Sequence, residues 1–310
     1  MSKRILITGG TGFIGSKLID GWLLDGHDIT LLTRRPKWIP ERWIGKVTAV
    51  SEFSDINVSA QDKGESSGID WVINLAGEGI ADARWTPKRK QALRDSRVGL
   101  TQRLARWADS TNQQFEAVLS GSAVGYYGSV DGIWPTFSET SAAGTDFSAS
   151  LCIDWEHAAK GLNDRTKRLV LLRTGIVLGG HGGMLKRMRL PFKLGLGGVI
   201  GSGQQVISWI HRDDYCRAIN YLLASDLTGP VNMTAPTPVS NREFTASLAT
   251  TLHRPALFPM PSVAAKLVFG ELSELLLKGQ NVSPTVLSQA GFDFKYPNLG
   301  QALEETMRLW

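Results

Sequence analysis

The sequence has 310 residues, 42% hydrophobic and 20% charged, which is typical of one large globular domain or of a domain with a smaller lobe. Its 34 basic and 29 acidic residues give a net charge of +5, with no long basic block and no basic stripe interleaved with aromatic residues, so we expect no nucleic-acid partner. No apolar run approaches the roughly 18 residues of a membrane span, and Cys152 and Cys216 lie in no metal-ligand spacing, so we expect no membrane partner and no metal site.

The first two residues lead directly into an apolar run, which leaves no room for a signal peptide and predicts a cytoplasmic protein. Short apolar runs bounded by turn residues predict strands at 3–8, 28–33, 46–50, 69–75, 115–120 and 167–173. Helical spacing of apolar residues lies between them, at 13–26, at 86–108 with Thr86 as N-cap and Pro87 in the first position, and at about 150–163. This alternation predicts an α/β fold of Rossmann type, a doubly wound parallel sheet whose strand ends share one edge.

The pattern changes after Gly175. Glycines surround a basic helical piece, Met184–Lys193, within residues 179–203. A strand at 206–210 and a helix capped by Asp213 or Asp214, to about 224, complete a domain that we assign to residues 1–229, with a substrate-side insertion at about 176–207. A short strand and several helices follow, and they predict a small, mostly helical C-terminal lobe at 230–310 that packs over the sheet edge.

A glycine-rich turn stands between the first strand and the first helix, with the pattern Gly9-x-x-Gly12-x-x-Gly15. Gly9 permits a tight turn, Gly12 lets a pyrophosphate approach the backbone, and Gly15 allows close packing of helix on strand. The N–H groups of the helix N-terminus suit the phosphates of a dinucleotide, although an ordinary strand–helix turn is the alternative. We therefore predict cofactor contacts from Gly9, Thr11, Gly12, Phe13, Ile14 and Gly15.

The end of the second strand indicates which dinucleotide binds. A site for NAD usually has an acidic residue there, which accepts hydrogen bonds from the ribose 2′-hydroxyl, whereas this sequence has Thr33-Arg34-Arg35. A guanidinium offers a fixed fork of donors that suits the 2′-phosphate of NADP. The alternative is a pair of solvated surface arginines. The pattern favours NADP(H) as the cofactor.

Two later strand ends complete the predicted site. Small residues after the strand at 69–75 let the cofactor riboses lie against the backbone, which predicts contacts from Asn74, Leu75, Ala76, Gly77 and Glu78. The segment 120–128 brings hydroxyl groups to the same edge, and Ser122, Tyr126 and Tyr127 are candidate catalytic residues, with a tyrosine acting as acid or base if its pKa were depressed. Each tyrosine has an equally good alternative role in packing or in bonding a loop.

Several motifs agree in order and spacing: TGGTGFIG, NLAG, SGSAVGYYG, RTGIVLG, WIHRDD and GQNVSPTVLSQAGFDF. Together they resemble the extended and atypical short-chain dehydrogenase/reductase superfamily and, within it, the YfcH-like, epimerase-like family (NAD-dependent epimerase/dehydratase). The resemblance covers essentially the whole chain. It implies strand order 3-2-1-4-5-6, NADP(H) binding, a role as a nucleoside-diphosphate-sugar epimerase, and cofactor contacts at Thr33, Arg34, Glu78 and the Arg84-Trp85 pair.

One departure from the superfamily bears on catalysis. Superfamily enzymes carry Tyr-x-x-x-Lys on the helix after the serine motif, and the best register here puts Cys152 and Glu156 at those positions. A carboxylate raises the pKa of a neighbouring acid, where a lysine lowers it. Two functions remain open: an NADP-dependent epimerase or oxidoreductase acting on a small polar substrate such as a sugar nucleotide, as a monomer or homodimer, and a non-catalytic NADP(H)-binding sensor. His211 is a further candidate acid/base, with a structural role as the alternative.

Overall fold

The structure is a computed structural model, and it describes residues 2–57, 68–131, 136–180 and 182–308. Its centre is a seven-stranded sheet in which every neighbouring pair is parallel. The strands, in their order across the sheet, are β10 (Gly229–Met233), β6 (Leu169–Thr174), β5 (Ala117–Ala123), β4 (Trp71–Asn74), β1 (Arg4–Thr8), β2 (Asp28–Leu32) and β3 (Val47–Val50). The expected Rossmann-type fold and the strand order 3-2-1-4-5-6 are confirmed, with β10 added at the far edge.

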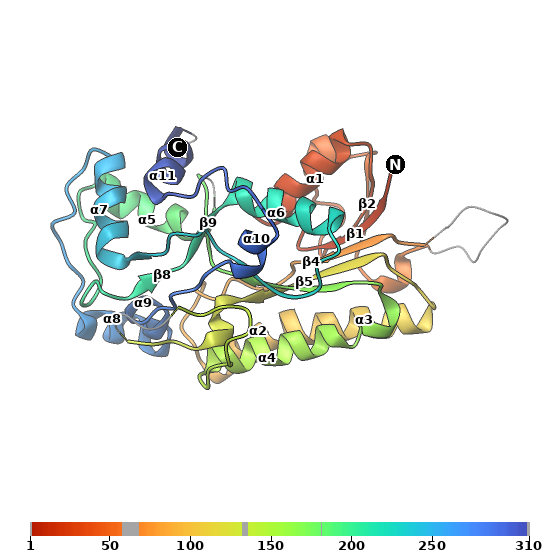
Figure 1. The fold of residues 1–310 in the computed structure, drawn as a ribbon, viewed down its shortest axis with the longest axis horizontal. Coiled ribbons are helices and arrows are strands. Elements are labelled where there is room, and N and C mark those ends of the chain that lie inside the picture. The colour runs from red at the N-terminus through yellow and green to blue at the C-terminus, as the bar shows by residue number, and fades with distance from the viewer. Residues whose placement is uncertain (1, 58–67, 132–135, 181, 309–310) are drawn as a thin grey trace.

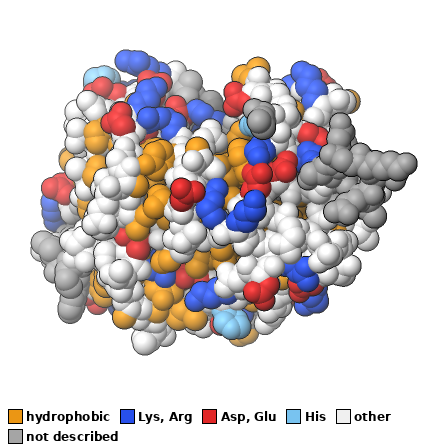
Figure 2. All heavy atoms as spheres, turned by 45° about the vertical axis from the view of Figure 1, so that its right-hand side comes forward, with side chains coloured by type: hydrophobic (Ala, Val, Ile, Leu, Met, Phe, Trp, Pro, Cys, Tyr) orange, Lys and Arg blue, Asp and Glu red, His pale blue; other side chains and the backbone are white. Residues whose placement is uncertain are grey.

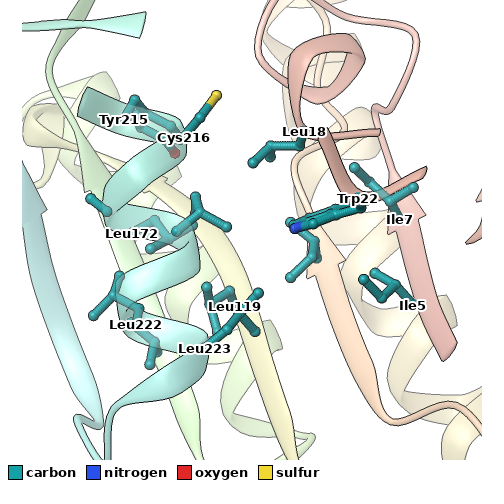
Figure 3. Close-up of a cluster of buried hydrophobic side chains, with 14 of the residues drawn as sticks. Ile5, Ile7, Leu18, Trp22, Leu119, Leu172, Tyr215, Cys216, Leu222 and Leu223 are labelled. Carbon is teal, nitrogen blue, oxygen red and sulfur yellow. The ribbon is translucent and has the colours of Figure 1, made fainter. Parts of the chain in front are cut away.

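Helices cover both faces of the sheet (Figure 1). One face carries α1 (Gly15–Leu24) and α6 (Arg212–Ala224), whose apolar sides meet the strands. Figure 3 shows Leu18 and Trp22 of α1 near Ile7 of β1, and Leu222 and Leu223 of α6 near Leu119 of β5, all within this core. The other face carries α3 (Leu100–Ser110) and α4 (Phe147–Lys160), and α2 (Pro87–Arg94), which precedes α3, buries only Leu93. Helices thus cover the sheet on both sides, and its strands are mostly apolar.

The remaining elements lie beside the sheet, most of them in a lobe at the left of Figure 1, while α10 (Thr285–Gln289) packs against β10 near the centre. They are β7 (Ile176–Leu178), α5 (Gly183–Lys193), β8 (Val206–Ile207), β9 (Trp209–His211), β11 (Val239–Ser240), α7 (Asn241–Thr251), α8 (Ser262–Phe269), α9 (Glu274–Leu277), α10 and α11 (Leu299–Arg308). One apolar cluster joins α5, β8 and β9 to α7 and α11. The proposed boundary at 229/230 falls on the first residues of β10, and the division into two units stays a prediction.

Three local predictions differ from the structure. The strand expected at 206–210 is two short strands, because β8 pairs antiparallel with β11 while β9 pairs parallel with β7. The cap of α6 is neither Asp213 nor Asp214 but His211, whose Nδ1 accepts from the Asp213 N–H at 3.2 Å. The helix expected at about 150 begins at Phe147, where Asp146 caps it.

The segment expected as one helix at 86–108 has the predicted cap, since Thr86 accepts from the Arg89 N–H at 3.2 Å. It contains a π-helical turn, Asp95–Gly99, between α2 and α3. None of the helices within the described residues is long and apolar enough to cross a membrane. The face drawn in Figure 2 carries acidic and basic side chains interspersed, with hydrophobic atoms between them.

Candidate functional site

The turn between β1 and α1 has the geometry that its glycines predict. Gly9 has φ of +71°, and a Cβ there would lie 2.7 Å from the backbone carbon of Leu75. A Cβ on Gly15 would lie 2.5 Å from the Gly9 carbonyl oxygen, so helix and turn pack closely. By contrast, a Cβ on Gly12 would approach no neighbour more closely than 3.0 Å. The fold itself therefore requires Gly9 and Gly15, while a Cβ on Gly12 would meet one protein atom outside its chain neighbours, the Gly9 carbonyl oxygen, and the pyrophosphate role of Gly12 stays a prediction.

Two side chains of the turn pack into the protein. Ile14 lies partly buried against the core of α1 and α6. Phe13 fits beneath a second glycine loop, because a Cβ on Gly182 would lie 2.3 Å from its ring and one on Gly179 would lie 2.6 Å from it. Since both side chains are occupied in packing, the cofactor contacts expected of Phe13 and Ile14 would come from their backbone.

Asn74, at the end of β4, ties three strands together. Its Oδ1 accepts from Thr8 Oγ1 at 2.7 Å, and its Nδ2 donates to Thr101 Oγ1 at 2.8 Å and to Ser120 Oγ at 3.2 Å. Only 1% of Asn74 is exposed. Because its donor and its acceptor already have partners, the amide organises this edge of the sheet, as expected of a residue that links neighbouring strands.

An open hollow of about 390 Å³ lies at the C-terminal end of β2 and is lined by Thr11, Thr33, Arg34, Arg35 and Trp38. The Arg34 side chain is 90% exposed, and its Nη1 lies 3.7 Å from Oε1 of Glu78, which also pairs with Arg89. The hollow thus brings together the glycine turn and the arginine pair, and Glu78 lies beside Arg34.

Trp38 was missed by the sequence reasoning. It is 81% exposed and lines the hollow, although indoles of this size are usually well buried. The available signal was an aromatic residue in the proline-bracketed segment 36–40, directly after the arginine pair. An aromatic face beside guanidinium groups suits a flat, charged ligand.

A buried ion pair lies at the end of β5, where the sequence predicted the candidate catalytic residues. Arg173 of β6 donates through Nε to Glu156 Oε1 at 2.8 Å and through Nη2 to Oε2 at 3.0 Å. Ser122 donates to the same Oε1 at 2.7 Å. The exposed fractions of Ser122, Glu156 and Arg173 are 3%, 4% and 3%. Glu156 is therefore held by a bidentate guanidinium and by the candidate catalytic serine.

The two tyrosines differ in their surroundings. Tyr127 is buried; its hydroxyl donates to Asn232 Oδ1 at 2.6 Å and accepts from Arg173 Nη1 at 3.1 Å. Burial raises the pKa of Tyr127 despite the opposing effect of Arg173. This is the reverse of the depressed pKa that a catalytic role required, so the structure disfavours Tyr127 as the acid or base. Tyr126 is half-buried, with its ring 3.5 Å from the guanidinium carbon of Arg173.

Cys152 behaves as expected of a buried filler. It is 4% exposed and forms no disulfide. Burial is the largest cause that raises its pKa, and the charge of Glu156 adds to it, giving a pKa of about 12. Because the thiolate, and not the thiol, is the base, this raised pKa disfavours Cys152 as a base at neutral pH.

Arg84 and Trp85, expected from the family resemblance to contact the cofactor, lie against the lobe and the loop after β4. Arg84 Nη2 donates to the Leu267 carbonyl at 3.0 Å, and the buried Trp85 donates to the Ile80 carbonyl at 3.0 Å. Their cofactor contacts stay predictions. His211 is 3% exposed, caps α6, and packs 4.2 Å from the ring of Tyr296, while burial lowers its pKa. These contacts favour its structural role.

A glycine-rich turn at the switch point of a parallel sheet defines a dinucleotide-binding protein of the Rossmann class. The chain belongs to the NAD dependent epimerase/dehydratase family, whose model matches residues 5–233. A second model, described as a domain of unknown function (DUF1731), matches residues 260–306. The resemblance seen in the sequence motifs is thereby confirmed, and the matched range contains the glycine turn, the arginine pair and the Ser122 centre.

Relatives match along nearly the full chain. An epimerase family protein of Mycobacterium bovis is 39% identical over 308 residues, covering 96% of each chain. The human epimerase family protein SDR39U1, solved with NADPH, is 34% identical, with a TM-score of 0.86 over 99% of this chain and all of that one. A nucleoside-diphosphate sugar epimerase of Corynebacterium glutamicum is 30% identical, with a TM-score of 0.76 over 99% of this chain and 58% of that one.

Proposed function

We propose that this chain binds NADP(H) in preference to NAD(H). The observation that carries this proposal is the hollow beside β2, where Arg34 and Arg35 stand in place of the acidic residue that binds an NAD ribose. Arg34 is exposed and its guanidinium is held near Glu78, so it is available to a 2′-phosphate without breaking a buried contact. The NADPH in the human relative's structure supports the same choice.

The reaction class follows from the family and from the Ser122 centre. We propose epimerisation or oxidoreduction of a nucleoside-diphosphate sugar or a similar polar carbonyl or alcohol, supported by the sugar epimerase among the relatives. When bound, the cofactor supplies a hydride donor and acceptor. The chain's own residues must then move one proton to or from the substrate oxygen.

Ser122 is the proposed proton-transfer residue. Its hydroxyl donates to Glu156 Oε1 and so keeps its lone pairs for the hydrogen of a substrate alcohol. As Ser122 accepts that proton it passes its own to Glu156, which Arg173 holds in position. Tyr126 is the remaining tyrosine candidate, because the hydroxyl of Tyr127 is already engaged.

A non-catalytic NADP(H)-binding protein is the second candidate, and the buried Cys152 and the Arg173-bound Glu156 favour it, because neither reproduces the Tyr-x-x-x-Lys pair. Absorbance at the reduced-nicotinamide band separates the two. A change in absorbance when sugar nucleotides are added to the protein with NADP(H) supports an oxidoreductase. An epimerase returns the hydride and leaves no net change, so product analysis by NMR is added, and the sensor is supported only when both readouts are negative across that substrate class.

Calorimetric titration with NADPH and NADH tests the cofactor choice. Arg34→Ala should weaken NADPH binding by about tenfold or more and leave NADH nearly unchanged, since a charge-assisted bond contributes about 1.5–3 kcal/mol. Arg103→Ala, an exposed arginine on α3, is the matched control and should change neither affinity. Comparable affinities of the unmutated protein for both cofactors would refute the proposal.

A further inference from the structure

Exposed hydrophobic side chains are concentrated on the C-terminal lobe. Of the twelve large ones among the described residues, eight lie within 190–196 and 257–268 and are 55% to 73% exposed. They are Leu190, Leu194, Leu196, Leu257, Phe258, Val263, Leu267 and Val268, and we call them the apolar face. Single exposed leucines need no explanation, but a grouping of this size on one lobe indicates a binding surface.

The two segments of the apolar face lie side by side. The Phe258 N–H donates to the Gly197 carbonyl at 3.2 Å, and the Met260 N–H donates to the Val199 carbonyl at 2.9 Å. A Cβ on Gly198 would lie 2.0 Å from the Phe258 carbonyl oxygen, so the close approach depends on glycine. The end of α5, the paired segments and the start of α8 therefore form one continuous stretch of surface.

The charges in these segments are of one sign. Residues 183–200 and 252–268 contain six basic residues, Lys186, Arg187, Arg189, Lys193, Arg254 and Lys266, and no Asp or Glu. Acidic side chains nearby are already paired: Asp82 with Arg187, Glu271 with Lys90 and Glu274 with Lys278. Arg187 is itself one of the six cations, so its pairing with Asp82 offsets one basic charge, and the two segments that form the apolar face still carry basic residues and no acidic ones.

We propose that the apolar face docks this protein on an anionic lipid surface. Aliphatic side chains that enter the headgroup region, flanked by Lys and Arg that face anionic lipids, are the features of peripheral membrane binding. A second copy of the chain fits less well, because a two-fold interface would oppose the same cations. The expected absence of a membrane partner rested on the lack of a spanning segment, and surface docking needs none.

The apolar face adjoins the loop that follows β4. Arg187 of α5 donates to the Ala81 carbonyl at 2.6 Å, and Arg84 donates to the carbonyl of Leu267, a residue of the face itself. Docking would therefore hold the loop that carries Glu78 next to the lipid. The inference does not depend on the proposed cofactor, because it rests on the exposed side chains and charges of residues 183–200 and 252–268 and not on Arg84 or Glu78.

Sedimentation of the full chain with vesicles tests the proposal. We expect binding to mixed phosphatidylcholine–phosphatidylglycerol vesicles, weak binding to phosphatidylcholine alone, and loss of binding as salt increases. Leu257→Gln/Leu267→Gln should lower the partition coefficient by about tenfold or more. Leu24→Gln, at an exposed leucine of α1, is the matched control and should leave it unchanged.

Circular dichroism and urea denaturation of each variant check that it folds. Three results would overturn the proposal: no binding to the anionic vesicles, binding that is the same with and without anionic lipid, or an equal loss of vesicle binding in the Leu24→Gln control. Analytical ultracentrifugation adds a further outcome: a dimer abolished by the double variant, without vesicle binding, would assign the apolar face to a second copy.

Discussion

Replacing Arg173 tests whether the buried pair with Glu156 is a structural requirement of the site. In Arg173→Met the side chain keeps a similar length, but Glu156 loses both guanidinium bonds, at 2.8 and 3.0 Å, in a position where it is only 4% exposed. The Arg173 bonds to Tyr127 and to the Glu139 carbonyl are lost as well. Removing one partner of a buried ion pair lowers the free energy of unfolding by about 3–5 kcal/mol, because the remaining buried charge has no partner.

Urea denaturation with linear extrapolation measures this cost. Arg165→Met is the matched control: Arg165 Nε lies 2.7 Å from Asp109 Oδ1, but the Asp109 side chain is 57% exposed, so its loss should cost about 0–1 kcal/mol. Arg173→Met/Glu156→Leu removes both charges and should recover much of the stability lost in the single variant. A single variant as stable as the control, or a double variant no better than the single, would refute this reasoning.

Three further outcomes are expected. Gly12→Val should abolish NADPH binding in calorimetry while circular dichroism stays native, because the new Cβ makes one tight protein contact, 3.0 Å from the Gly9 carbonyl oxygen, which a shift of a few tenths of an ångström in the turn relieves. Normal binding by a folded variant would contradict the pyrophosphate role. Burial lowers the pKa of His211, so the unfolded chain binds more protons than the folded one and the free energy of unfolding decreases as the pH falls below about 6.5. His211→Asn, which keeps a capping side chain, should make this decrease toward about pH 5 shallower, and an unchanged slope would argue against a contribution from His211. Once turnover is measurable, Ser122→Ala should lower kcat by about a hundredfold or more and Cys152→Ala should change it little; the opposite order would move proton transfer to the helix.

Much of the fold followed from local patterns in the sequence. The spacing of apolar residues that marks a strand or a helix is a local signal, because it is read within a few consecutive residues. The bounds of β1 to β6 and of α1 were therefore predicted close to those observed. The glycine turn was equally accessible, because its spacing and its place between strand and helix are local. Where two neighbouring strands share one apolar run, as in β8 and β9, the sequence alone did not show that their partners differ.

Tertiary structure alone decided which side chains meet. Glu156 was recognised in the sequence as a departure from the superfamily, but its partner Arg173 lies on another element and meets it only when α4 packs on the sheet. The available signal was a charged residue in the otherwise apolar strand β6. In the same way, the bond from the Tyr127 hydroxyl to Asn232 joins segments 105 residues apart, whereas the cap role of His211 and the place of Trp38 beside the arginine pair are local. Sequence periodicity determines which face of an element is apolar, whereas the identity of a buried polar partner is fixed only by the three-dimensional arrangement that must satisfy it.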